Sequence, residues 1–188
     1  MELEGFPVRT LRGDRLLYRI HRTTNGPWWF SGGGGGRFDP VGTELGTCYL
    51  ALRPVGAWIE VFRKQMTLAE AEPRERSLWT GTAGRDLRLA DLLSRRALRY
   101  GVTASVGANE HYDASHAFAA DAARAGFDGI RHLLRHDPAQ RLVGIAVFAK
   151  AGAPDPGSAW PAGNDRPIER ALIGEAESSF GYRVLPTP

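Results

Sequence analysis

The chain has 188 residues, of which 43% are hydrophobic and 24% charged, and its formal net charge is +3. This composition is typical of one globular domain, and a second domain would be cramped at this length. The longest clearly apolar stretch, residues 142–149, is much shorter than the roughly 20 residues that cross a bilayer, and no secretory signal is expected at the N-terminus. Because Cys48 is the only cysteine, no intrachain disulfide can form, and we expect a cytoplasmic protein.

Arginine supplies nearly all of the positive charge, since Lys64 and Lys150 are the only lysines. Arginine binds phosphate through paired hydrogen bonds, so this bias fits a phosphate-bearing ligand. Codon usage in a GC-rich genome explains the bias equally well. The basic residues are scattered along the chain, as on solvated faces, and they do not form a nucleic-acid footprint. We therefore expect no direct contact with nucleic acid.

The first half of the chain predicts two strands, a long loop between them and a helix. Alternating apolar residues indicate the first strand, glycines indicate the loop, and a proline suited to a first helical turn indicates the helix. In chain order these elements are the strand 16–20, the loop 26–40, the strand 47–52 and the helix 54–65. We expect Trp58, Val61 and Phe62 to pack inward. Residues 68–83 are polar and predict no regular element.

The second half predicts further strands and helices in a mixed order. They are a strand and helix within 86–101, a helix over 114–125, strands over 129–134 and 142–148, a surface loop over 152–166, and a strand pair or a short helix and strand over 171–184. Asp113 is expected to cap the helix that follows it, and Gly126 to end that helix. No regular β-α-β rhythm is present, which favours an α+β fold. We predict a single domain with its core in residues 16–150 and a C-terminal extension, 151–188, packed on that core.

Five consecutive glycines, residues 32–36, lead into Arg37 and Phe38. The run matches neither the G-x-G-x-x-G fingerprint nor a P-loop, and taken alone it is best explained as a flexible loop. Backbone N–H groups in such a loop can, however, approach a phosphate. An arginine and an aromatic residue at the exit of the loop would suit a lid over a ligand.

Arg19 lies on the first predicted strand and needs a counter-charge if it is buried, for which Glu60 is the obvious candidate. Such a pair could simply order the core. Alternatively, Arg19 binds a phosphate while Glu60 acts on the sugar of a ligand, and the sequence leaves both readings open. Tyr49 could stack on a planar ring, whereas the aromatic residues 28–30 are better explained as core. The five histidines show no zinc motif, so no metal is predicted. Among them His136 is the best candidate for a functional role, although a surface histidine is the simpler reading.

These motifs, taken in order, resemble the RES-domain family. They are Tyr18-Arg19, then Gly36-Arg37-Phe38-Asp39-Pro40, then Cys48-Tyr49-Leu50-Ala51, then Glu60 on a helix, and later Gly126-Phe127-Asp128-Gly129-Ile130. The resemblance covers roughly residues 16–148. It implies a fold similar to that of ADP-ribosyltransferases, in which helices flank a mixed β-sheet.

The resemblance also implies an activity and a partner. RES proteins degrade NAD, releasing nicotinamide by hydrolysis or phosphorolysis, and many are toxins of type II toxin–antitoxin pairs. Their usual partner is an antitoxin with a helix-turn-helix domain, which blocks the active site. Two alternatives stay open: a mono-ADP-ribosyltransferase that modifies a protein, and an inactive homologue that binds NAD or a partner. The oligomeric state also stays open, and a homo-oligomer is among the options.

Residue by residue, the resemblance places the two arginines of the family on Arg19 and Arg37, its tyrosine on Tyr49 and its glutamate on Glu60. We therefore expect Glu60, Arg19 and Tyr49 to be catalytic. Arg19, Arg37 and Tyr49 are expected to bind NAD.

The serine of the family has no direct counterpart in this chain. The resemblance places it near Leu134, which is a leucine here. Ser115, at the start of the alanine-rich helix, is the replacement that we expect among the NAD-binding residues. Asp113 is a second candidate for that role.

Overall fold

The structure is a computed structural model that describes residues 2–63, 65–103, 106–107, 109–155 and 157–186. Within these residues, eight strands form one mixed sheet in the order β1-β6-β7-β8-β3-β2-β5-β9. These strands are β1 (Val8–Leu11), β2 (Leu17–Arg22), β3 (Leu45–Ala51), β5 (Arg76–Gly81), β6 (Leu87–Asp91), β7 (Gly129–Leu133), β8 (Val143–Lys150) and β9 (Asn164–Pro167). The short strands β4 (Thr67–Ala69) and β10 (Arg183–Leu185) form a separate parallel pair.

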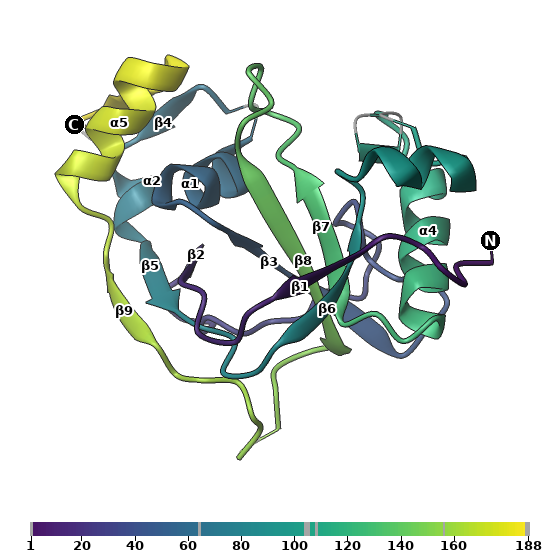
Figure 1. The fold of residues 1–188 in the computed structure, drawn as a ribbon. Helices are drawn as coiled ribbons and strands as arrows, with labels where there is room; N and C mark the ends of the chain where they lie inside the picture. Colours follow the sequence, from purple (N-terminus) through teal and green to yellow (C-terminus); the bar gives the residue numbers. More distant parts are fainter. Residues whose placement is uncertain (1, 64, 104–105, 108, 156, 187–188) are drawn as a thin grey trace.

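Helices cover the sheet at its two ends. They are α1 (Pro54–Phe62), α2 (Ala71–Arg74), the 3-10 helix η1 (Arg95–Tyr100), α4 (Asp113–Arg124) and α5 (Arg170–Phe180). Figure 1 shows α4 beside the N-terminal segment at one side of the molecule and α1, α2 and α5 together at the other side. The prediction of an α+β domain with helices flanking a mixed sheet is therefore confirmed. Among the described residues, no helix is long and apolar enough to cross a membrane.

Alternation along the central strands directs side chains to opposite faces of the sheet. On β8, Ile145 and Val147 face one buried cluster, whereas Ala146 and Phe148 face another that lies under α4. A third cluster, which includes Trp58 of α1, joins α1 and α5 to the sheet. The expectation that Trp58, Val61 and Phe62 pack inward is confirmed for Trp58 and Phe62, which are 0% and 3% exposed, whereas Val61 is only partly buried against the same cluster.

The sheet opens between β2 and β3. Strand β3 pairs with β8 over its whole length, from Leu45 to Ala51. It pairs with β2 only where Tyr18 lies opposite Ala51. Beyond that point the two strands diverge, and a cavity lined by Arg19, Tyr49 and Glu60 lies at the opening. The divergence therefore places predicted site residues from three elements around one space.

Several local expectations are wrong. The segment 68–83 includes the last two residues of β4 and the whole of α2 and β5, with Leu78 and Trp79 of β5 buried. Leu78 and Trp79 point to opposite faces of the sheet and join different buried clusters, so both faces of β5 are covered and the strand shows little alternation. The segment 152–166, expected to be a loop, includes the start of the edge strand β9.

Two single residues also differ from expectation. Trp29 is 47% exposed, whereas its neighbours Trp28 and Phe30 are buried as expected. Asp113 is the first residue of α4, and the cap position before it is Tyr112, which makes no capping hydrogen bond with its side chain. The expected stop is in place just beyond the helix, since Gly126 has a φ of +74°.

Candidate active site

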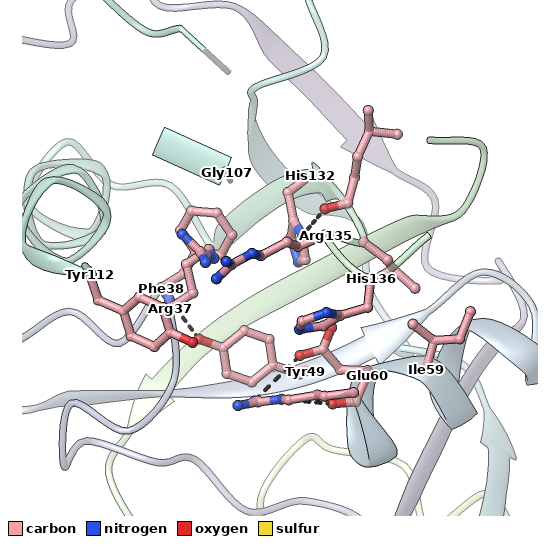
Figure 2. Close-up of a pocket in the computed structure, with 13 residues that line it drawn as sticks. Arg37, Phe38, Tyr49, Ile59, Glu60, Gly107, Tyr112, His132, Arg135 and His136 are labelled. Carbon is pink, nitrogen blue, oxygen red and sulfur yellow. Dashed lines mark hydrogen bonds and ion pairs between the residues drawn. The ribbon is translucent and has the colours of Figure 1, made fainter. Parts of the chain in front are cut away.

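A pocket lies where β3, α1, the loop before β3 and the segment after β7 meet. Figure 2 shows Arg135 and His136, from the segment after β7, facing Tyr49 of β3 and Glu60 of α1 across this pocket. Arg37 also lines the pocket. The cavity at the sheet opening shares Tyr49 and Glu60 with it. Arg19, Arg37, Tyr49 and Glu60 therefore surround two adjoining cavities.

Arg37 is buried without a hydrogen-bond partner for the end of its side chain. It is 9% exposed, and in the described part of the chain neither Nη1 nor Nη2 has a partner. The guanidinium carbon lies 4.6 Å from the centre of the Tyr112 ring, a cation–π contact that compensates only part of the lost hydration. Burial lowers the pKa of Arg37 from its ordinary value. A buried cation with unused donors is well suited to an anionic ligand.

The exit of the glycine loop is fixed to β3 by a small hydrogen-bond network. The Gly36 N–H donates to Asp39 Oδ2 at 3.0 Å, and the Phe38 N–H donates to the Tyr49 hydroxyl at 2.7 Å. That hydroxyl donates to Asp39 Oδ1 at 3.3 Å, and the Thr47 hydroxyl donates to the Phe38 carbonyl at 2.7 Å. These bonds hold the backbone on both sides of Arg37, so its side chain is directed by a rigid turn.

Tyr49 is a structural part of the pocket wall. Burial, with a contribution from the Asp39 carboxylate, raises the pKa of Tyr49 well above its ordinary value. The hydroxyl therefore stays protonated at neutral pH and can donate to Asp39 while it accepts from Phe38. Tyr49 lines both the Arg37 pocket and the cavity that Arg19 lines.

Glu60 carries a carboxyl group that titrates near neutrality. Burial raises its pKa to about 7, although Arg63 and then Arg37 act in the opposite direction. Arg63 Nη2 lies 3.7 Å from Glu60 Oε1, and the Glu60 side chain is 21% exposed. Both protonation states are consequently accessible at physiological pH.

Arg19 does not form the predicted ion pair with Glu60. Its Nη1 donates to the Trp29 carbonyl at 3.3 Å and also contacts Cys48 Sγ. Glu60 pairs with Arg63 instead. The two predicted partners nevertheless line the same cavity at the sheet opening.

Ser115 does not reach the pocket. It is 0% exposed within α4, and its hydroxyl donates to the Val106 carbonyl at 2.6 Å, so it holds the segment before α4 in place. Asp113 is exposed and does not line the pocket. Leu134, at the expected position of the family serine, does line it and is 1% exposed. The pocket therefore presents an apolar side chain where a hydroxyl was expected.

Sequence reasoning missed some pocket residues, above all His132. The imidazole is 5% exposed, and its Nδ1–H donates to the Leu133 carbonyl at 3.0 Å. Its Nε2 is therefore a buried acceptor, and it has no partner within the described residues. Burial lowers the pKa of His132 to about 4, so the ring is neutral at pH 7. No local motif distinguishes His132 from the other histidines. Arg63 was also missed, although it follows Glu60 at the i,i+3 spacing at which side chains on a helix form ion pairs.

The fold and the site define the class of protein. The RES-domain family model matches residues 16–165, and the chain belongs to the RES-domain family. No curated protein matches the chain. Among solved structures, a chain in the crystal structure of the M. tuberculosis MbcT-MbcA toxin-antitoxin complex has a TM-score of 0.66 and 22% sequence identity. The match covers 90% of this chain and 92% of that chain, and at this identity it shows the fold.

Metal ligands are not evident: in the part of the chain that the structure describes, no three His, Cys, Asp or Glu side chains gather as a metal site.

Proposed function

We propose that this chain is an enzyme that degrades NAD by cleaving the bond between nicotinamide and its ribose. Membership of the RES-domain family supports the proposal. The observation that carries it is the buried Arg37 guanidinium, whose two unpartnered nitrogens lie in a pocket that Glu60 also lines. Such a pocket favours a ligand in which an anionic phosphate group lies close to a sugar.

Arg37 and Arg19 are assigned to the phosphates of NAD. Arg37 offers two donors that no group in the described part of the chain uses, and Arg19 lies at the adjoining cavity, so both arginines could contact one pyrophosphate. Tyr49 would pack beside the nicotinamide end. These charge-assisted hydrogen bonds favour binding and fix the ribose near Glu60.

Glu60 is assigned to the reacting ribose. The ring nitrogen of nicotinamide is already cationic, so it leaves with the electrons of the C–N bond and needs no general acid. The ribose then passes through an oxocarbenium-like state, and an oxygen nucleophile adds to the same carbon while it loses its proton to solvent. An ionised Glu60 carboxylate would hold the ribose hydroxyls and stabilise the positive charge.

The first test compares NAD turnover by the wild type and Glu60→Gln. The substitution keeps the shape of the side chain but removes its charge, so turnover should fall by at least about a hundredfold. Glu75→Gln is the control, because Glu75 is exposed and lies outside the pocket. Nicotinamide release is followed by chromatography. Equal turnover by the wild type and Glu60→Gln, with both proteins folded, would rule out this role for Glu60.

The acceptor is identified in the same assay. Reactions with and without inorganic phosphate distinguish ADP-ribose, the product of hydrolysis, from its phosphorylated form, the product of phosphorolysis. Intact-mass spectrometry of added proteins detects ADP-ribose adducts. Adducts that account for the released nicotinamide would favour a protein-modifying transferase over free NAD degradation.

We also propose that the chain acts as a toxin whose partner is an antitoxin with a helix-turn-helix domain. The family membership supports this, as does the shared fold with a chain of the MbcT-MbcA toxin-antitoxin complex. Expression of the wild type in bacteria should deplete cellular NAD and stop growth, whereas expression of Glu60→Gln should not. Co-expression of a helix-turn-helix protein encoded beside this chain should restore growth. Normal growth and normal NAD levels with abundant wild-type protein would contradict the toxin role.

One observation favours a second candidate, an inactive homologue that binds NAD. The buried side chain at the expected serine position is Leu134, which offers no hydrogen bond. Calorimetry with NAD distinguishes the two candidates. Binding without nicotinamide release would establish the binder, and release by the wild type would exclude it.

A further inference from the structure

Arg63 lies where the cavities around the site converge. It lines the Arg37 pocket, the cavity at the sheet opening, and a third cavity that includes Phe180 and Tyr182 from the C-terminal segment. No motif of the family resemblance includes this residue. Its position connects Glu60 to a part of the chain far away in sequence.

The backbone of Arg63 adopts a conformation that glycine prefers. Its φ is 47° and its ψ is −113°, immediately after the last residue of α1. A residue with a Cβ is strained in this region, and such strain persists only where the surroundings hold it. The Arg63 N–H donates to the Ile59 carbonyl at 2.9 Å, and the Tyr182 hydroxyl donates to the Arg63 carbonyl at 2.9 Å. The end of α1 is therefore held from both sides.

The strained backbone turns the Arg63 side chain back over Glu60. Arg63 Nε donates to the Glu60 carbonyl at 3.1 Å, and Nη2 lies 3.7 Å from the carboxylate oxygen Oε1. Glycine would relieve the strain at this position but would lose both contacts. The sequence thus has arginine where the backbone alone favours glycine, which indicates that the side chain has a role.

We propose that Arg63 is a positioning residue for Glu60, held in its strained conformation by Tyr182, so that the C-terminal segment forms part of the active site. The inference rests on the proposed function for its link to NAD cleavage. The Arg63 guanidinium contacts both the side-chain carboxylate and the backbone carbonyl of Glu60, and these two contacts fix the position of the carboxylate. The segment that follows α5 takes part in the site through Tyr182, which is 4% exposed and whose hydroxyl donates to the Arg63 carbonyl.

Arg63 also favours the ionised form of Glu60, because it opposes the effect of burial on the pKa of this carboxyl group. Charged and titratable groups from the elements around the two cavities share walls with Glu60. They are Arg19, Arg37, Tyr49, Arg63, Tyr112, His132, Arg135 and His136. Arg63 has the larger effect of the two cations that lower the pKa of Glu60, and Arg37 has the smaller one.

The deciding experiment measures the titration of Glu60 directly, so it does not depend on any activity. Protein labelled with ¹³C at glutamate carboxyl groups is titrated by NMR, and Glu60→Gln identifies the resonance. In Arg63→Gly the midpoint of Glu60 should rise by about half to one pH unit, since a nearby opposite charge is lost. Gln140→Gly is the matched control, because Gln140 has a φ of 51° but is not part of the Glu60 surroundings. An unchanged midpoint in folded Arg63→Gly would overturn the inference.

Kinetics then test the positioning role. Arg63→Gly should lower the turnover number for NAD by at least about tenfold at pH 6.5 and by less at pH 8.5, while its thermal stability is equal or higher because strain is relieved. Arg63→Lys should recover part of the loss. Tyr182→Phe should reduce turnover in the same direction by a smaller factor. Turnover and pH profile equal to those of the wild type in Arg63→Gly would mean that Arg63 is only structural.

The two possible failures are distinct. If the wild type consumes no NAD, the proposed function fails, and the NMR titration still decides whether Arg63 controls Glu60. If the wild type consumes NAD but Arg63→Gly titrates and reacts like the wild type, only the inference about Arg63 fails.

Discussion

Arg37 and His132 line the same pocket, and both have polar side-chain atoms without a partner among the residues that the structure describes. Arg37 has two nitrogens that can only donate, and the Nε2 of His132 can only accept while Nδ1 donates to Leu133. Unpartnered groups of this kind are costly inside a protein and are normally satisfied by a protein group, a water molecule or a ligand. Their coincidence beside Glu60 therefore favours a polar ligand over simple core packing at this site.

At the residue scale, Leu134 gives a direct test of the family serine. Leu134→Ser places a hydroxyl at the expected position and should raise NAD turnover severalfold, if the pocket is otherwise intact. The same change should lower the free energy of unfolding by about 3 kcal/mol, because it removes a buried leucine. Steady-state kinetics and urea denaturation measure the two effects.

The matched control for this prediction is Leu134→Ala. It leaves a cavity of similar size without adding a hydroxyl, so its stability should fall by a similar amount while turnover does not increase. Equal turnover in the serine and alanine variants would show that the hydroxyl itself contributes nothing at this position.

The sequence identified residues whose types and order form motifs, but it could not identify those that depend on folding. Arg19, Arg37, Tyr49 and Glu60 were named from ordered motifs, and the structure places them around adjoining cavities. Ser115, the expected replacement at the start of the alanine-rich helix, instead donates its hydroxyl to the backbone carbonyl of Val106. His132 could not be distinguished, because only burial by the surrounding strands and loops makes its imidazole unusual.

At the element scale, the last residue of the glycine loop, Gly36, has no room for a side chain. A Cβ on Gly36 would lie 2.5 Å from Asp39 Oδ1 and 2.6 Å from the Tyr49 hydroxyl. Gly36→Ala should therefore break the network that directs Arg37, lower the free energy of unfolding by about 1–3 kcal/mol and reduce turnover. Gly33→Ala is the control, since a Cβ there meets nothing within 4 Å. Urea denaturation compares the two, and equal stabilities would contradict the packing argument.

Elements were predictable where their apolar residues form a clear pattern or where a residue such as proline marks the start of a helix. Strand β2 begins with an alternating apolar stretch, β8 is a continuous apolar run, and α1 begins at Pro54 as expected. Strand β5 was not predicted because Leu78 and Trp79 are buried on opposite faces, so the six residues RSLWTG show neither alternation nor a long apolar run. Pairing with β9, which lies more than 80 residues further along the chain, is what makes β5 an inner strand. Such long-range pairing leaves no local pattern in the sequence.

At the scale of the whole molecule, the opening between β2 and β3 divides the domain into two parts that share the site. One part supplies Arg19, and the other supplies Arg37 and His132. Glu60 lies on α1, which packs against both β2 and β3. A ligand that bridges the cavities would therefore contact both parts and stabilise the folded protein by mass action.

The two buried groups of the site also affect global stability in opposite directions. His132 has a pKa of about 4, below its ordinary 6.5. Its contribution to the free energy of unfolding is therefore present above pH 6.5 and is lost as the pH falls through about 4. Glu60 has a pKa of about 7, above its ordinary 4.5. Its contribution to the free energy of unfolding is therefore present below pH 4.5 and is lost as the pH rises through about 7. Between pH 4.5 and 6.5 the two effects oppose each other in the wild type.

Glu60→Gln should remove one of these effects and expose the other. Relative to the wild type, the variant lacks the stability gained on acidification, so it should become comparatively less stable by about 2 kcal/mol between pH 7.5 and pH 4.5. This value is below the full effect of the pKa shift because the side chain is 21% exposed. Urea denaturation at several pH values measures the difference, with Glu75→Gln as the control. Stability curves of Glu60→Gln and the wild type that run parallel over this range would mean that Glu60 titrates at its ordinary value in the folded protein.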